Sequence, residues 1–130
     1  MPTIGIIDDR EDVRKTLRMG MKTVLESDWN TVDSSPLPQL NDYLSWIGTN
    51  KIVSLIVDEK LNEIALDLSG AVDYYGHDLV DFLRSRLKTF PIFVVTSYPD
   101  EQSLKDRFKD VEAIIDRRHF LKTLENYLST

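Results

Sequence analysis

The sequence predicts an α/β protein in which helices cover both faces of a parallel β-sheet. Five short apolar runs alternate along the 130 residues with longer stretches whose apolar residues recur at helical spacing. Several runs are nearly continuous in Ile, Val, Leu and Phe, as strands are when both faces of their sheet are covered. Because alternating strands and helices are joined by right-handed crossovers, we expect a three-layer sandwich.

The five apolar runs are the predicted strands. The first, third and fourth are the continuous ones, and the second is the weakest. The predicted strands cover residues 3–8, 30–34, 52–58, 91–97 and 112–116.

An amphipathic stretch follows each predicted strand. Within each stretch, apolar residues three or four positions apart form a stripe on one face of a helix. The five stripes contain, in order, Val13, Leu17, Met21, Val24 and Leu25; Leu40, Tyr43, Leu44 and Ile47; Leu79, Phe82, Leu83 and Leu87; Leu104 and Phe108; and Leu121, Leu124 and Leu128. The fourth of these predicted helices is the shortest.

The connection over residues 59–76 is long, because loops in this architecture usually take roughly 2 to 6 residues. Its apolar residues Ile64, Leu66 and Leu68 suit either a small hairpin arm or a turn of helix. We expect an ordered insertion here, within a single domain that spans residues 1–130. The anchors expected for this insertion are Val72, Tyr74 and Tyr75.

The composition is that of one folded domain, with 42% hydrophobic and 29% charged residues. No apolar stretch approaches the roughly 18 residues of a membrane-spanning helix, and the short apolar run at the start lacks the basic flank of a secretory signal. The absence of cysteine excludes disulfides and thiolate chemistry. We therefore expect a cytoplasmic protein without a membrane partner. A net charge of −6 argues against a nucleic-acid partner, because DNA affinity comes largely from Lys and Arg that neutralise phosphates.

Polar side chains follow the predicted strands at the points where these strands end. Asp8 and Asp9 end the first strand, and Asp58 ends the third. Thr96 ends the fourth strand and Arg117 follows the fifth. In an open parallel sheet, ligands bind at the edge where the carboxyl ends of the strands meet. We therefore expect these five side chains on one rim of the sheet.

Three carboxylates on one rim repel each other, by roughly 4 kcal/mol for a pair about 4 Å apart at an effective dielectric near 20. A cation is therefore expected, and Mg²⁺ suits because it prefers oxygen ligands and is commonly held by carboxylates plus a phosphate. With Mg²⁺ bound, one carboxylate can attack a phosphorus centre. A simpler interpretation makes Asp9 and Asp12 the N-cap and first-turn acid of a helix, which leaves Asp8 and Asp58 unexplained.

Four segments carry a resemblance to a known family. They are IIDDR with the acidic pair, LIVDEKL with the third acid, PIFVVTSYPD with the threonine, and AIIDRRHFLKTL with the last strand and helix. Over essentially its whole length the chain resembles the CheY-like receiver domain of two-component response regulators. The resemblance implies a flavodoxin-like, five-stranded parallel sheet with the strand order 2-1-3-4-5.

The resemblance also implies a role for each site residue. Asp58 is the expected phosphoacceptor, and Thr96 the hydroxyl that bonds a phosphoryl oxygen. Asp8, Asp9 and Asp58 are the expected Mg²⁺ ligands, together with the backbone carbonyl of Lys60. The expected partners are a sensor histidine kinase or phosphotransfer protein and an unknown downstream protein target.

The chain departs from this family at the phosphate-binding and switch positions. Arg117 stands where receivers carry a lysine, and an alignment through Arg118 would place polar residues at the apolar positions of the last helix. The guanidinium of arginine is broad and planar, whereas the ammonium of lysine is a compact charge. Arg117 can therefore bind a phosphoryl oxygen, or it can form a permanent ion pair with Asp58. Ile114 replaces the family's switch aromatic, and Tyr98 is the only nearby ring that can substitute.

These features leave three functions open. The first is a stand-alone receiver, not an enzyme in the usual sense, that accepts a phosphoryl group on Asp58 in a magnesium-dependent phosphorelay and signals through protein contacts. The alternative is a phosphorylation-independent pseudo-receiver, a protein-interaction module in which Arg117 or Lys60 neutralises the acids. A hydrolase of the haloacid dehalogenase type is disfavoured, because that family has a second acid at the position of Lys60.

Basic residues recur every four positions along one face of the first predicted helix. They are Arg10, Arg14, Arg18 and Lys22. The simplest interpretation is a solvated helix face. The alternative is that Arg14, Arg18 and Lys22 dock an upstream kinase, since contacts with the first helix are what the family resemblance implies.

Overall fold

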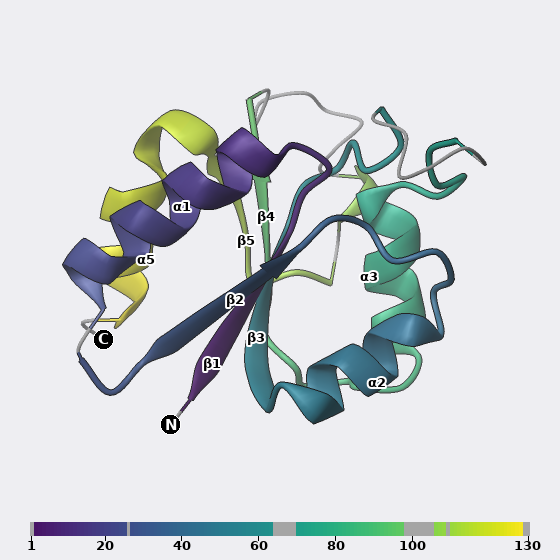
Figure 1. Cartoon of the computed structure of the whole chain (residues 1–130), viewed down its shortest axis with the longest axis horizontal. Helices are drawn as coiled ribbons and strands as arrows, with labels where there is room; N and C mark the ends of the chain where they lie inside the picture. Colours follow the sequence, from purple (N-terminus) through teal and green to yellow (C-terminus); the bar gives the residue numbers. More distant parts are fainter. Residues whose placement is uncertain (1, 26, 64–69, 98–105, 109, 129–130) are drawn as a thin grey trace.

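A computed structural model describes residues 2–25, 27–63, 70–97, 106–108 and 110–128 of the chain. Five strands form one parallel sheet in the order β2-β1-β3-β4-β5, which confirms the predicted fold class and strand order (Figure 1). The strands are β1 (Thr3–Ile7), β2 (Asn30–Ser34), β3 (Ile52–Val57), β4 (Ile92–Thr96) and β5 (Ala113–Asp116). Each strand lies inside its predicted range.

Helices cover both faces of the sheet, as the sequence predicts. Figure 1 shows α1 and α5 on one face and α2 and α3 on the other. The helices are α1 (Glu11–Val24), α2 (Asp42–Thr49), α3 (Gly76–Arg84) and α5 (Phe120–Leu128), with the short 3₁₀ helix η1 (Arg117–His119) before α5. Of the predicted fourth helix, Leu104 lies outside the described residues, whereas residues 106–107 are helical and Phe108 is buried after them.

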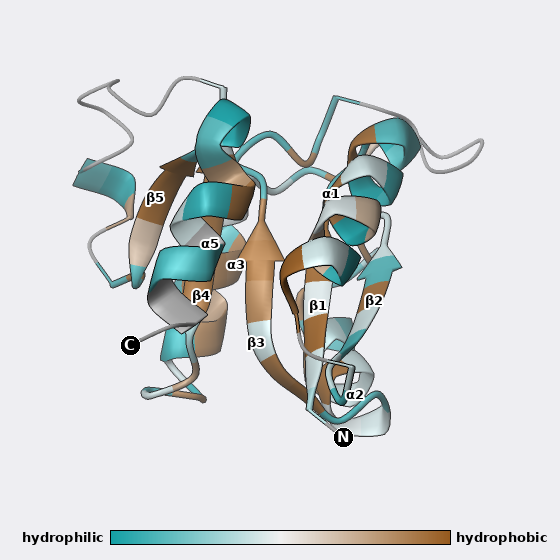
Figure 2. Ribbon diagram, turned by 90° about the vertical axis from the view of Figure 1, so that its left-hand side faces the viewer, coloured by the Kyte–Doolittle hydropathy of each residue, from teal (hydrophilic) through white to brown (hydrophobic). Residues whose placement is uncertain are grey.

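The sheet separates two apolar cores, because successive strand residues point to opposite faces. Ile6 of β1 and Ile56 of β3 pack with Met21 and Phe120 under α1 and α5. Their strand neighbours, such as Leu55, pack in the larger core under α2 and α3. Figure 2 shows apolar residues along the central strands β3 and β4. Both faces of these strands are covered by helices, and this explains their continuous runs of branched side chains.

The long connection between β3 and α3 is attached to the fold near its C-terminal end. Tyr74 is buried there, and its hydroxyl lies 2.6 Å from that of Tyr43 in α2. The Tyr74 hydroxyl also donates to the carbonyl of Leu37, and burial raises the pKa of Tyr43 to about 12. Of the expected anchors, Val72 is buried too, whereas Tyr75 is exposed. The expected hairpin or helical turn around Ile64, Leu66 and Leu68 lies outside the described residues.

The basic stripe on α1 has partners within the chain. Arg14 donates through Nε to Asp33 of β2 at 2.9 Å, and Arg18 donates through Nη1 to the other oxygen of Asp33 at 2.6 Å. Arg14 also donates to the backbone carbonyl of Asp8 at 2.7 Å. The two arginines therefore tie α1 to β2 and to the end of β1, while their docking role, with Lys22, stays a prediction.

In the part of the chain that the structure describes, no helix is both long enough and apolar enough to cross a lipid bilayer.

The Asp33 ion pairs should stabilise the fold measurably. The Asp33→Asn variant leaves the largely covered Arg14 and the partly exposed Arg18 without their shared counter-charge, so we expect the free energy of unfolding to fall by about 1–3 kcal/mol in urea denaturation. The matched control is Glu11→Gln, whose 3.1 Å pair with Lys15 is well exposed and should change stability by under about 0.5 kcal/mol. Equal effects of the two variants would contradict this prediction.

Candidate functional site

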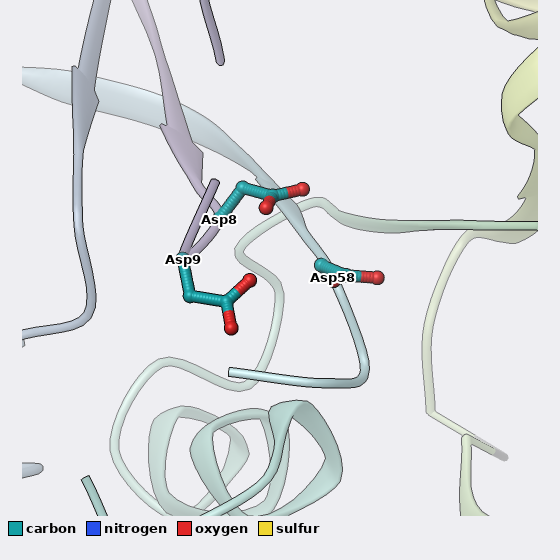
Figure 3. A group of neighbouring side chains, drawn as sticks. All are labelled: Asp8, Asp9 and Asp58. Atoms are coloured by element: carbon teal, nitrogen blue, oxygen red, sulfur yellow. The ribbon is translucent and has the colours of Figure 1, made fainter. Parts of the chain in front are cut away.

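Two neighbouring strands bring three carboxylates together. Strands β1 and β3 are parallel and paired, with Ile7 opposite Val57, so the residues that follow these two positions emerge at the same edge of the sheet. These residues are Asp8 and Asp9 after β1 and Asp58 after β3. One carboxylate oxygen from each lies within 4.8 Å of the others, and Figure 3 shows the three side chains grouped there.

The acids are buried, and one of their oxygens is left without a protein partner. Asp8 and Asp9 are 3% and 6% exposed. Asp8 accepts a hydrogen bond from the backbone N–H of Arg10 at 2.9 Å, and Oδ2 of Asp9 accepts one from the backbone N–H of Glu63 at 3.0 Å. The other oxygen of Asp9, Oδ1, is buried without a hydrogen-bond partner among the described residues. A buried polar atom in this state is costly unless a ligand satisfies it.

Burial and mutual repulsion shift the titration of this cluster. Burial raises the pKa of Asp8 to about 6, against the opposing effects of the Arg10 hydrogen bond and the Arg117 charge. Burial raises the pKa of Asp58 to about 7, and the neighbouring charge of Asp8 raises it further, while Arg117 lowers it. The positive charge of Arg117 therefore compensates the acid cluster only in part.

The residues present fit a divalent cation. The donor set consists of carboxylate oxygens, which are the ligands that Mg²⁺ prefers. Oδ1 of Asp9 has a lone pair that the rest of the described chain leaves unused. A bound cation would satisfy this oxygen and would also offset the burial and the repulsion that together raise the two pKa values.

Thr96 and Arg117 lie at the same cleft as Asp58, which has a volume of about 420 Å³. Thr96 is the last residue of β4 and is buried. Arg117 begins η1 directly after β5, and its Nη2 lies 3.8 Å from Oδ1 of Asp58. Arg118 instead turns to Asp116 at 2.6 Å and lowers the pKa of that partly buried acid to about 2. The arginine that the alignment selects therefore faces the acids.

Other residues named from the sequence have weaker structural support. Lys60 is exposed and borders the cleft, but the role of its carbonyl as a metal ligand stays a prediction. Ile114, at the position of the family's switch aromatic, packs against the core under α2 and α3. Tyr98, the ring expected to substitute for it, lies outside the described residues.

Sequence reasoning missed a second cluster beside Asp58. The carboxylate of Glu59 is buried, with His77 Nδ1 at 3.0 Å and Arg107 Nη1 at 3.5 Å. The sequence indicates a surface or capping role for His77. Arg107 lies in the fourth predicted helix, whose apolar stripe consists of only two residues, Leu104 and Phe108. The local sequence signal is the second acid in DEK, directly after the expected phosphoacceptor, and it indicates neither His77 nor Arg107 as a partner.

The start of α3 is packed against the backbone of Asp58. The N–H of Gly76 donates to the carbonyl of Glu59 at 2.8 Å. A Cβ atom at Gly76 would lie 2.3 Å from the carbonyl oxygen of Asp58 and 2.9 Å from Cα of Glu59. Only glycine therefore allows α3 to begin this close to the expected phosphoacceptor.

The sequence matches no protein-family model and no curated protein. By structure, the chain is similar to TrrA of Thermotoga maritima, a response regulator protein in complex with Mg²⁺ and BeF, with a TM-score of 0.73, 13% identity and coverage of 99% of this chain and 97% of TrrA. A second structure holds TrrA in complex with the histidine kinase ThkA.

Two further similar structures are receiver domains in the non-phosphorylated state. HemR of Leptospira biflexa aligns with a TM-score of 0.71 and 17% identity over 100% of this chain and 96% of its own. RcsB of Escherichia coli aligns with a TM-score of 0.72 and 16% identity over 98% of this chain and 89% of its own. The chain spans 57% of the RcsB response regulator of Salmonella typhimurium. At these identities the likeness shows the fold: the chain has the receiver fold.

Asp58→Asn should stabilise the metal-free protein above neutral pH. The pKa of Asp58 is about 7 in the folded protein and about 4 in the unfolded chain. Between these two pH values the folded protein holds a proton on Asp58 that the unfolded chain has already released. Wild-type stability therefore falls as the pH rises from about 4 to 7, and above that window Asp58→Asn should be more stable by on the order of 1–3 kcal/mol.

Urea denaturation at pH 5 and pH 8 with a chelator measures this effect. The control is Asp12→Asn, an exposed acid at the same cleft, which should leave the pH dependence unchanged. If Asp58→Asn keeps the wild-type pH dependence, the raised pKa of Asp58 is wrong.

Gly76→Ala should destabilise the protein, because the three nearest atoms that its Cβ would meet all belong to backbone. We expect a loss of about 1–3 kcal/mol in the free energy of unfolding, measured by urea denaturation. Gly48→Ala in α2 is the matched control: its Cβ would meet nothing within 4 Å, so it should be neutral or stabilising by up to about 1 kcal/mol. The opposite order of the two variants would refute the close approach of α3 to Asp58.

Proposed function

We propose that the protein is a receiver that accepts a phosphoryl group on Asp58 in a magnesium-dependent phosphorelay. The observation that carries the proposal is Oδ1 of Asp9, which has no hydrogen-bond partner among the described residues. It belongs to a cluster of three carboxylates, of which Asp58 lines the cleft that Thr96 and Arg117 also border. The receiver fold supports it, because the cluster lies beyond the carboxyl ends of the strands, where open parallel sheets bind ligands.

In the proposed reaction an oxygen of Asp58 attacks the phosphorus atom of a phosphodonor. A P–O bond forms while the bond to the donor atom breaks, and its electron pair stays on the donor, which takes up a proton if it is a histidine ring. The Thr96 hydroxyl donates to one phosphoryl oxygen, and the guanidinium of Arg117 donates to another. When bound to Asp8, Asp9, Asp58 and the carbonyl of Lys60, Mg²⁺ supplies the charge that stabilises the transferring group.

The partners that suit this reaction are proteins. The donor is a sensor histidine kinase or a phosphotransfer protein, and the complex of TrrA with a histidine kinase supports this class of partner. We propose a single domain that acts alone in the cytoplasm, with an insertion around residues 59–76, and that signals to an unknown protein target without binding nucleic acid or membrane. On this proposal the chain is a signalling domain and not an enzyme that turns over a substrate.

The pseudo-receiver is the second candidate, and one contact favours it. Arg117 lies 3.8 Å from Asp58, so its charge already compensates part of the acid cluster. In that case the chain would be an interaction module that binds neither Mg²⁺ nor phosphate. The hydrolase alternative gains no support from the site, because Lys60 occupies the position of its second acid.

Magnesium binding and phosphodonor uptake separate these candidates. We expect Mg²⁺ to raise the melting temperature, by the equivalent of roughly 2.7 kcal/mol at a hundredfold excess over its dissociation constant. Incubation with radiolabelled phosphoramidate should label the wild-type protein only when Mg²⁺ is present. Asp58→Asn should abolish the labelling, and Asp9→Asn should abolish both the labelling and the shift in melting temperature.

The matched control is again Asp12→Asn, an acid of the same cleft outside the cluster, which should keep both responses. Labelling that survives Asp58→Asn, or that needs no divalent cation, would eliminate the receiver. A wild-type protein with neither response would instead support the pseudo-receiver.

A further inference from the structure

The buried carboxylate of Glu59 has two kinds of partner. His77, at the start of α3, faces it with its ring Nδ1 at 3.0 Å and its backbone N–H at 3.4 Å. Arg107, in the segment after β4, has its Nη1 3.5 Å from Oε2 of the same carboxylate. The side chain of Glu59 is 5% exposed, whereas that of Arg107 is 45% exposed.

The ion pair between Glu59 and Arg107 is weaker than the interaction between Glu59 and His77. A single contact of 3.5 Å to a half-exposed guanidinium contributes little, because solvent screens it and the long side chain must be ordered. His77 alone supplies a ring nitrogen and a backbone N–H to the same carboxylate. Glu59 can therefore lose Arg107 and still keep hydrogen-bond donors, so Arg107 is its exchangeable partner.

Arg107 also borders the cleft that Asp58, Thr96 and Arg117 line. A phosphoryl group on Asp58 would add roughly −1.5 to −2 charges to this cleft. Its oxygens accept paired hydrogen bonds from a guanidinium, which are shorter and stronger than one long contact to a carboxylate. The added group would therefore compete with Glu59 for the side chain of Arg107.

We propose that Arg107 is a second phosphoryl-binding residue, held by Glu59 while Asp58 is unmodified and transferred to the phosphoryl group when Asp58 is modified. The inference rests on the proposed function and deepens it, because it adds a residue from the segment after β4 to the phosphate site.

The exchange would carry a signal away from the site. The next residue, Phe108, is buried in the core under α2 and α3, and its ring meets the ring of His77 edge-on with centroids 6.3 Å apart. A movement of Arg107 would therefore displace the neighbouring side chain of Phe108, which is packed in this core. This route needs no aromatic residue at Ile114, where the family resemblance leads one to expect the switch.

The affinity for beryllofluoride, a phosphoryl mimic, tests the exchange in the presence of Mg²⁺. Fluorine NMR of the bound anion gives the dissociation constant for each variant. Arg107→Gln should weaken binding about tenfold, the size expected for one lost charge-assisted hydrogen bond. The matched control is Arg10→Gln, which removes the same charge from the same cleft without touching Glu59 and should weaken binding by less than about twofold.

Glu59→Gln should tighten binding of the anion, because it releases Arg107. The double variant Glu59→Gln with Arg107→Gln separates this effect from simple removal of a negative charge: the gain must disappear when Arg107 is absent. A gain that persists in the double variant overturns the exchange, and so does unchanged affinity in Arg107→Gln.

A second measurement does not depend on binding strength. Unfolding free energies of the two single variants and the double variant should show coupling between Glu59 and Arg107 without ligand, and none with Mg²⁺ and beryllofluoride bound. Coupling that is equal in both states overturns the inference while leaving the receiver function intact. If the wild-type protein binds no beryllofluoride at all, the proposed function itself fails, and the exchange fails with it.

Discussion

The structure of the site depends on one electrostatic constraint: like charges are held together at the ends of two adjacent strands. The pairing of β1 with β3 leaves Asp8 and Asp58 no alternative but to emerge side by side. Their pKa values are raised because both side chains are removed from water by burial, and the charge of Arg117 only partly compensates for this loss. Part of the free energy gained by packing the sheet is thus stored as repulsion, which a cation or a proton can release.

The fold and the acid cluster were predictable from the sequence for the same reason. The continuous apolar runs determine which segments are strands, and the alternation with helices makes the strands parallel. Once the strands are parallel, an acid directly after a strand has only one edge of the sheet to occupy. The choice of Arg117 over Arg118 was also predictable, because the apolar periodicity of α5 fixes the register of the preceding residues.

The Glu59 cluster was not predictable, because its members are joined only by tertiary packing. His77 is eighteen residues from Glu59 in the chain, and Arg107 is forty-eight residues away. Nothing in the local pattern indicates that a polar residue after a strand turns inward instead of outward. The partners of Arg14 and Arg18 were missed similarly: a periodic row of charges shows which helix face they share, but not that Asp33 lies opposite.

The hydrogen bond from the backbone N–H of Glu63 to Asp9 links the long connection between β3 and α3 to the acid cluster. One oxygen of Asp9 is committed to that loop and the other faces the acid cluster, so the loop sets the rotation of the carboxylate about its Cβ–Cγ bond. Changes in the length or sequence of this connection would then alter how tightly the proposed Mg²⁺ site holds its ion, while the three carboxylates of the cluster stay the same. The affinity of the proposed site for an ion and the identity of the residues that would bind the ion are therefore determined by different stretches of the sequence.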